Sequence, residues 1–143
     1  MNIEELYTPE ILALACDIPR LGRLEAPDAT VSLRSRLCGS RITVDLSLDA
    51  DTIVDFTQRV EACALAQASA ALLGRHVTGA TDAELHAVRD ALRAMLKDGA
   101  PPPGGKWRDL AVFLPVRDVS ARHDSVLLPF DAVCRALEEA RER

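Results

Sequence analysis

The sequence predicts an α+β fold in which a three-stranded antiparallel meander is covered by helices on one face. Three successive segments, 31–37, 42–48 and 54–60, carry mostly apolar residues at every second position, with Ser35 and Gln58 as the polar exceptions, which is the period of a strand with one buried face. The links between them, 38–40 and 49–51, are short enough to join neighbouring strands as hairpins. Because the alternate residues are polar, the sheet has one apolar face, and helices are expected to cover that face alone.

Helices are expected on both sides of these strands in the sequence, because apolar residues there recur with the spacing of a helix. They are predicted over 3–15, over 62–76, from the capping box Thr81-Asp82-Ala83-Glu84 to Gly99, over 107–113 and over 126–141. Pro129 is expected near the first turn of the last helix, where a proline is tolerated. We find no internal repeat and no second domain, so residues 1–143 are predicted to form one domain.

The composition excludes several classes of function. The 143 residues are 48% hydrophobic, enough for an ordinary core, and carry a net charge of −5 without a run of Lys or Arg. Aromatic residues make up only 3%, so the basic, aromatic-bearing face of a nucleic-acid-binding protein is not expected. No stretch reaches the roughly 20 apolar residues that span a bilayer, and the acidic start of the chain is unlike a secretory signal. We therefore expect a cytoplasmic protein that binds neither nucleic acid nor a membrane.

Cys38 and Cys63 are the strongest candidates for a functional site, because a cytoplasmic protein uses cysteines for thiol chemistry or metal more often than for disulfides. Cys38 follows the first predicted strand and Cys63 opens the helix after the third. A meander brings both to the same end of the sheet, within about 10 Å. Two thiols at one place are half of a zinc or iron–sulfur site. The alternative is that both only fill space, since cysteine is among the most buried residue types.

The remaining cysteines and the histidines carry weaker signals. Cys16 and Cys134 lie in predicted helices without a partner at an element end, and we expect them to be packing residues. His76 and His86 are expected on helix surfaces with no matching partner. His123 precedes the last predicted helix and is interpreted either as a surface or capping residue or as a metal ligand.

The order of these segments resembles the iron–sulfur cluster assembly scaffolds of the IscU, NifU N-terminal and SufU type. That family typically has a Cys-Gly-Asp segment, two strands and then a Cys-(Ala/Ser)-Ile-(Ser/Ala)-x-Ala-Ser segment. Here Cys-Gly-Ser at 38–40 and CALAQAS at 63–69 stand in those places, and IPRLG at 18–22 is similar to the family's Asn-Pro-Arg-Asn-x-Gly turn. The long stretch between the second segment and the last helix is similar to the insertion of the SufU branch. The resemblance implies the α+β fold described above, binding of a cluster or metal, and a cysteine desulfurase as partner.

The chain also departs from the family at its ligand positions. Ser40 stands where the family has an aspartate. An alignment without gaps puts Ser125 in place of the third cysteine and Asp124 at the preceding Lys or His position. A shift of one residue would instead match His123 and Asp124 to the family's His-Cys pair. Loss of the third cysteine removes the position that usually takes up sulfur in such scaffolds.

This altered set of side chains favours some metals over others. Two cysteines and a serine are a poor ligand set for a two-iron, two-sulfide cluster, which is held mostly by thiolates. Zinc or transiently bound iron is less demanding, and the candidate donors are Cys38, Cys63, His123 and Asp124. Because adjacent residues rarely both reach one ion, three protein ligands and a water are expected.

Three hypotheses follow. The first is a scaffold-like protein of cluster assembly that binds metal through Cys38 and Cys63 and accepts sulfur from a desulfurase. The second is a degenerate adaptor or regulator that binds a desulfurase without carrying a cluster. The third is a small zinc-binding or thiol enzyme unrelated to clusters. The absence of a His or Lys placed beside either cysteine as a general base weighs against thiol catalysis, and the protein is expected not to be an enzyme.

Overall fold

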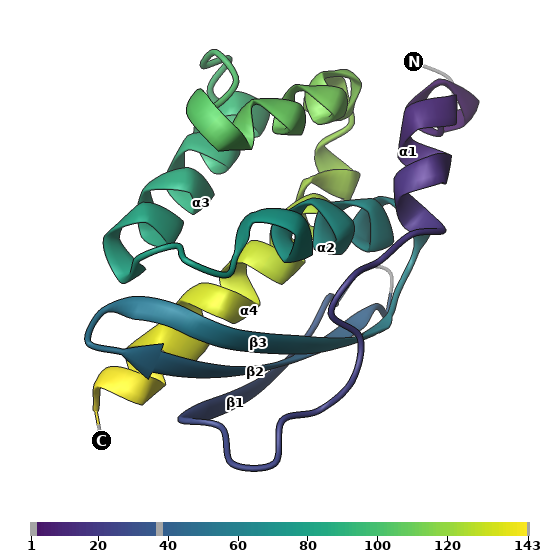
Figure 1. The fold of residues 1–143 in the computed structure, drawn as a ribbon. Helices are drawn as coiled ribbons and strands as arrows, with labels where there is room; N and C mark the ends of the chain where they lie inside the picture. The colour runs from purple at the N-terminus through teal and green to yellow at the C-terminus, as the bar shows by residue number, and fades with distance from the viewer. Residues whose placement is uncertain (1–2, 37–38, 143) are drawn as a thin grey trace.

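The computed structural model describes residues 3–36 and 39–142 and has the α+β fold that the sequence predicts (Figure 1). Its elements in chain order are η1 (Ile3–Leu6), α1 (Pro9–Ala15), β1 (Ala29–Arg34), β2 (Arg41–Asp49), β3 (Thr52–Glu61), α2 (Ala64–His76), α3 (Asp82–Lys97), η2 (Gly105–Asp118), η3 (Ser120–Arg122) and α4 (His123–Arg141), where η marks a 3-10 helix. No helix in the described part of the chain is both long and apolar enough to cross a membrane.

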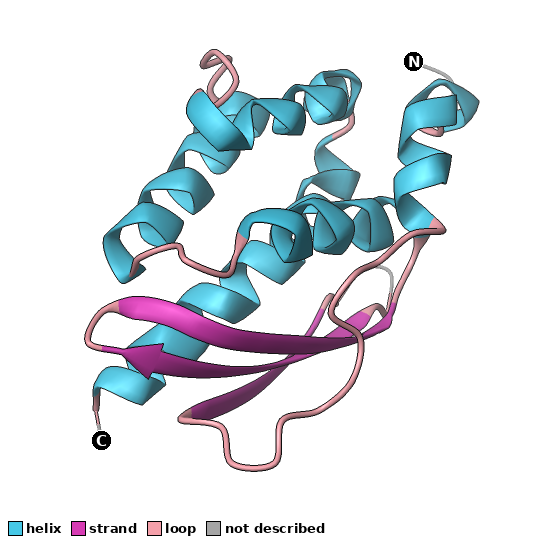
Figure 2. Cartoon of the chain, in the orientation of Figure 1, coloured by secondary structure: helices cyan, strands magenta, loops and turns pink. Residues whose placement is uncertain are grey.

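The three strands form one antiparallel sheet in the order β1-β2-β3, which confirms the predicted meander. In the central strand, Val44 lies opposite Val31 of β1 and Gln58 of β3. Ile42, Val44 and Leu46 are at most 1% exposed and alternate with polar residues along β2. The helices gather on one side of the strands (Figure 2), so this apolar side of the sheet is the one they cover.

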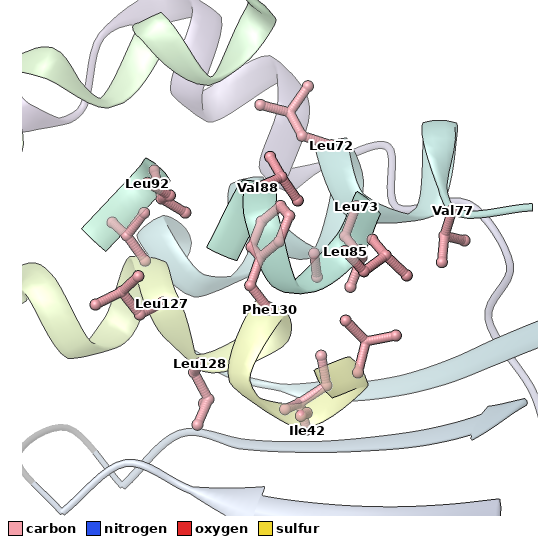
Figure 3. Close-up of a cluster of buried hydrophobic side chains, with 14 of the residues drawn as sticks. Ile42, Leu72, Leu73, Val77, Leu85, Val88, Leu92, Leu127, Leu128 and Phe130 are labelled. Atoms are coloured by element: carbon pink, nitrogen blue, oxygen red, sulfur yellow. The ribbon is translucent and has the colours of Figure 1, made fainter. Parts of the chain in front are cut away.

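The core lies between this face of the sheet and the helices. α4 packs against β1 and β2, and α2 and α3 pack against α4 in turn. Figure 3 shows Phe130 of α4 among Leu73 of α2, Leu85 of α3 and Ile42 of β2, all of them buried. α4 therefore holds the helical layer and the sheet together, as its run of apolar residues predicts.

The prediction of one unbroken helix over 3–15 is wrong. The 3-10 turn at Ile3–Leu6 is separated from α1 by Thr8, whose backbone is extended with ψ 161°. The hydroxyl of Thr8 caps α1 by accepting the N–H of Ile11 at 3.2 Å. Pro9 follows, and the residue before a proline is sterically disfavoured in the helical conformation, so the chain restarts its helix there.

Two helix predictions near the C-terminus also need correction. α4 starts at His123, three residues earlier than predicted, so Pro129 lies in its second turn and not in the first. Proline has no N–H and therefore cannot donate a hydrogen bond within the helix, which is why it is usually confined to the first turn. The short helix expected over 107–113 is instead part of a longer run of 3-10 turns, Gly105–Asp118.

The capping box is confirmed, while the first strand is displaced from its predicted range. Thr81 accepts the N–H of Glu84 at 3.1 Å, as the sequence pattern predicts. The first strand was expected over 31–37 but runs from Ala29 to Arg34. Beyond Arg34 the chain turns, because the N–H of Ser35 donates to the carbonyl of Ser40 at 2.8 Å.

A buried carboxylate ties the connection between α1 and β1 to the opposite face of the sheet. Asp45 of β2 is 1% exposed, and it accepts hydrogen bonds from Arg23 Nε at 2.7 Å, Leu24 N–H at 3.0 Å and Thr30 Oγ1 at 2.7 Å. Burial by itself raises the pKa of Asp45, but the hydrogen bonds from Arg23, Thr30 and Leu24 outweigh it and hold the pKa below its usual range. The folded protein therefore stabilises the charged carboxylate form of Asp45.

We expect Asp45→Asn to lower the free energy of unfolding at neutral pH by about 2–3 kcal/mol, because a neutral amide cannot accept all three donors. A lowered pKa stabilises the fold above the unfolded pKa, near 3.9, and this contribution is lost as the pH falls through the folded pKa. Urea unfolding from pH 7 down to about 2 should therefore show the gap between the two proteins narrowing below about pH 4. The exposed Asp49→Asn is the control, and a gap that stays constant with pH would contradict the assignment.

Candidate functional site

The two segments that carry the predicted cysteines meet at one end of the sheet. β2 and β3 are in register from Arg41 opposite Glu61, so the residues just outside these strands lie side by side. The hydroxyl of Ser40 accepts the backbone N–H of Cys63 at 3.0 Å. Cys38 lies outside the described residues, but its neighbour Gly39 leads directly into this contact. The sequence prediction that both cysteine-bearing segments reach the same sheet end thus holds for the part that the structure describes.

Cys63 stands at the junction between β3 and α2. It is the N-cap residue of α2, with an extended backbone (φ −66°, ψ 166°), and its side chain makes no capping hydrogen bond. The thiol is free and half-buried. Its backbone is held from two sides, since its N–H donates to Ser40 Oγ and its carbonyl accepts the N–H of Gln67 at 2.9 Å. The position of the thiol is therefore set by the sheet and by the helix together.

Ser40, the residue at the family's aspartate position, is part of this support. It is 2% exposed, and besides holding Cys63 it closes the turn after β1 through its carbonyl. Gly39 has a φ of +70°, the left-handed region in which a residue without Cβ is favoured. The Gly-Ser pair thus shapes the turn that returns the chain to β2.

His123 and Asp124 open α4 in different environments. His123 is 4% exposed, and its Nε2–H donates to the carbonyls of Val116 and Arg117, each at 3.0 Å. Only Nδ1 is then left as a metal donor, and an imidazole whose other nitrogen is held by a carbonyl is typical of metal-bound histidine. Asp124 is exposed in the first turn of α4.

Ser125, aligned with the third cysteine of the family, is buried at the start of α4 with an exposure of 2%. Its neighbour Val126 is tied to α2, because the hydroxyl of Ser69 donates to the carbonyl of Val126 at 2.6 Å. Ser69 belongs to the CALAQAS segment that Cys63 begins. The segment 63–69 therefore carries the candidate ligand Cys63, and through Ser69 it also holds α4, which carries His123 and Asp124.

The four cysteines of the chain cannot all serve one site. Cys16 is exposed at the C-cap of α1, and the neighbouring Asp17 lies 3.8 Å from Arg75 in the last turn of α2, at the opposite end of that helix from Cys63. Cys134 is 1% exposed, and its Sγ approaches the carbonyl of Leu85 at 3.6 Å. Burial raises the pKa of the Cys134 thiol to about 12, which keeps it protonated.

Within residues 3–36 and 39–142, no three His, Cys, Asp or Glu side chains are close enough together to hold a metal ion. Cys63, His123 and Asp124 all belong to this part, so they do not form a complete site by themselves. A site of three protein ligands at Cys63 therefore requires Cys38. With two cysteines at most, the chain does not fit a cluster held by four thiolates.

The histidines that the sequence suggested had no partner do have partners. His76 lies 3.7 Å from Asp109 Oδ2 and packs edge-on against Trp107 with ring centroids 5.5 Å apart. His86 Nδ1 lies 2.7 Å from a carboxylate oxygen of Asp82. The contacts of His76 join α2 to η2, and that of His86 spans one turn of α3. The contacts of His76 could not have been found from sequence spacing, because their partners lie on a different element.

Sequence reasoning also missed the side chain that anchors α2 to the N-terminal connection. Gln58 is fully buried, and its Nε2 donates to the carbonyls of Pro19 at 3.1 Å and Ala70 at 3.0 Å. Gly74 of α2 makes room for it: a Cβ there would lie 2.8 Å from Gln58 Nε2 and 2.9 Å from Pro19 Cγ. Two features of the sequence could have indicated this contact: Gln58 is a polar residue on the apolar face of a predicted strand, and Gly74 is a glycine inside a predicted helix.

These features define a class of protein: a small α+β domain in which the six-residue connection between β1 and β2 and the N-terminus of α2 bring cysteine-bearing segments to one end of a meander. The model of the NifU-like N-terminal domain family matches residues 6–106. No curated protein matches the sequence.

Solved structures agree with this class. A nitrogen-fixing NifU-like protein (N-terminal) from Brucella abortus is 45% identical, with a TM-score of 0.95, and the match covers 99% of this chain and 98% of that one. A putative iron–sulfur cluster assembly scaffold protein for the SUF system from Fervidobacterium islandicum is 22% identical, with a TM-score of 0.87 over 95% and 99% of the two chains. A hypothetical protein at 20% identity has a TM-score of 0.83 over the same shares. The chain belongs to the NifU-like N-terminal domain family.

Proposed function

We propose that this protein takes part in iron–sulfur cluster assembly as a two-cysteine member of its family, with Cys38 and Cys63 binding iron or zinc and accepting sulfur from a cysteine desulfurase. The observation that carries the proposal is the hydrogen bond from Cys63 N–H to Ser40 Oγ at 3.0 Å, because it holds the two cysteine-bearing segments against each other. The role is that of a carrier and not of an enzyme, and it fits the reducing cytoplasm, in which thiols stay free.

The third ligand comes from the start of α4. His123 through Nδ1 is the better placed candidate, because its Nε2–H is already oriented by two carbonyls. Asp124 is the alternative, and a water completes the tetrahedron in either case. Such a set of two thiolates, one further ligand and a water holds a single iron or zinc ion, and a complete cluster only as transient cargo.

Sulfur transfer needs no group beyond the thiols. The thiolate of Cys63 or Cys38 attacks the outer sulfur of a persulfide on the donor protein. A new S–S bond forms at the attacking cysteine, the donor's S–S bond breaks, and the donor leaves as a thiolate, so that no external oxidant or reductant is consumed.

An adaptor that binds the desulfurase without a metal is the second candidate. This candidate is favoured by the burial of the two positions at which the chain departs from the family's ligands, since Ser40 and Ser125 are each only 2% exposed. Side chains so deeply buried can be kept for the fold alone after a ligand set has been lost.

The test is metal analysis of protein purified without oxygen, with Cys38→Ser and Cys63→Ser beside it and the exposed Cys16→Ser as matched control. We expect about one iron or zinc ion per chain in the wild type and in Cys16→Ser, and its loss in the other two variants. The same proteins are then added to a desulfurase assay that follows the rate of cluster formation. A metal-free wild type that still binds the desulfurase would favour the adaptor, and equal metal in all four proteins would refute the shared site.

A further inference from the structure

Three arginines lie on the face of the sheet that the helices do not cover, at the end where Cys63 lies. The strand register sets Arg34 of β1 directly opposite Arg41 of β2. Thr43 of β2, two residues after Arg41 and therefore on the same face, lies opposite Arg59 of β3. All three arginines are exposed. We call them the arginine face.

The arginine face is not neutralised within the part of the chain that the structure describes. Five other arginines have carboxylate partners: Arg23 pairs with Asp45, Arg75 with Asp17, Arg89 and Arg93 with Asp131, and Arg141 with Asp82. The exposed Arg20, Arg108 and Arg135 make no such pair in the described part of the chain, but among the paired strand positions only Arg34 and Arg41 set two arginines directly opposite each other. No such ion pair is made there by a member of the arginine face, although Glu61 lies opposite Arg41 in the register. Like charges directly opposite on neighbouring strands destabilise a sheet. An arrangement that costs stability and has no partner inside the described chain points to a partner outside it.

A hollow between the side chains indicates which group the arginine face would receive. The hollow has a volume of about 100 Å³ and is lined by Arg41, Thr43, Arg59 and Glu61. The hydroxyl of Thr43 donates to Ser32 Oγ at 3.0 Å, so the floor is polar. The hollow is lined by two guanidinium groups and by the single carboxylate of Glu61, so one positive charge is left for a further carboxylate, which accepts paired hydrogen bonds from arginine.

We propose that the arginine face docks a carboxylate-rich surface of the protein that delivers sulfur, with one carboxylate of that partner between Arg41 and Arg59. Arg41 is the neighbour of Ser40, which contacts Cys63, so a partner held here has its own reactive group within reach of the cysteine pair. This inference rests on the proposed function for the identity of the partner, but not for the chemistry that the face recognises.

A protein surface suits the arginine face better than a nucleic acid does. The cross-strand neighbours of the three arginines on this face are Ser32, Thr43 and Glu61. None of them is aromatic, so a nucleic-acid base would find no side chain on which to stack. The chain as a whole carries a net charge of −5, so the arginine face is a local site for acidic groups and not part of an extended basic surface of the kind that holds a nucleic acid.

The test is a titration of full-length protein against the desulfurase at about 50 mM and about 300 mM salt. The variant is Arg34→Glu/Arg59→Glu, and the matched control is Lys97→Glu/Arg108→Glu, which changes the net charge equally at exposed positions of the helical layer. We expect the first variant to bind about tenfold or more weakly at low salt, and the control to bind within about twofold of the wild type. Arg34→Glu alone should leave the thermal midpoint unchanged or raise it by about 1–3 °C, because it places Glu opposite Arg41.

A second titration separates this inference from the proposed function. It uses a peptide of about ten glutamates and a single-stranded oligonucleotide of similar charge. Binding of the peptide that is lost in Arg34→Glu/Arg59→Glu supports the arginine face even if the desulfurase does not bind, in which case only the partner named by the proposed function is wrong. The inference is overturned if the wild type binds the desulfurase and the variant binds it equally well, if the oligonucleotide is preferred to the peptide, or if the peptide binds the wild type and the variant alike.

Discussion

Ser125→Cys is expected to raise the affinity for zinc by about 100-fold or more, because it restores a third thiolate to a set that now holds two. Ser125 is the third residue of α4 and is 2% exposed, so the new thiol enters a closed position with little change in volume. Adding Ser40→Asp restores the family's aspartate beside Cys63 and should increase the affinity further. Competition with a chromophoric zinc chelator measures the change.

The control for this gain is Ser120→Cys, which adds a thiol in η3 at an exposed position a few residues away. If Ser120→Cys binds zinc as tightly as Ser125→Cys does, proximity of any extra thiol explains the effect. If Ser125→Cys binds no tighter than the wild type, the alignment of Ser125 with the third cysteine is wrong, and the shifted alignment through His123 and Asp124 takes its place.

Gly74→Ala is expected to lower the free energy of unfolding by about 2–3 kcal/mol, although alanine is the better helix former by about 1 kcal/mol. The added methyl would lie 2.8 Å from Gln58 Nε2, 2.9 Å from Pro19 Cγ and 3.3 Å from the carbonyl oxygen of Pro19. Moving Gln58 away breaks two buried hydrogen bonds, and moving Pro19 detaches the N-terminal connection from α2. Urea denaturation followed by circular dichroism gives the value.

Two further variants make the interpretation of Gly74→Ala specific. Gly104→Ala is the control, because a Cβ at Gly104 meets nothing within 4 Å, and its stability should match the wild type. Pro19→Ala removes one of the two clashing groups, so Gly74→Ala should cost less in that background than in the wild type. Equal costs in both backgrounds would show that the packing against Pro19 is not the cause.

The sheet and the cysteine-bearing end of the site follow from local patterns. The period of two in 42–48 needs only the order of the residues, and links of three residues leave hairpins as the simplest connection. From these the sequence predicts that Cys63 and the turn before β2 share one sheet end, which the contact between Ser40 and Cys63 confirms.

The sequence was less informative where a residue's role depends on distant contacts. A ligand alignment names His123, but the orientation of its ring depends on the carbonyls of η2, whose 3-10 turns lack a clear apolar period. The break before α1 was missed because the apolar spacing over 3–15 outweighed the signal of Thr8-Pro9, although the capping Thr and the following proline were both visible.

The amino-acid order by itself determined the α+β class, the meander, the capped start of α3 and the meeting of Cys63 with the turn before β2 at one sheet end, because periodicity and turn chemistry act between residues close in sequence. Only the tertiary structure decided that Gln58 joins Pro19 to Ala70, that Ser69 holds α4 through Val126, and that Arg34, Arg41 and Arg59 share one uncovered face. The partners of Gln58 and Ser69 lie on other elements of the chain, and the three arginines lie on three different strands, so these arrangements exist only once the strands and helices have come together.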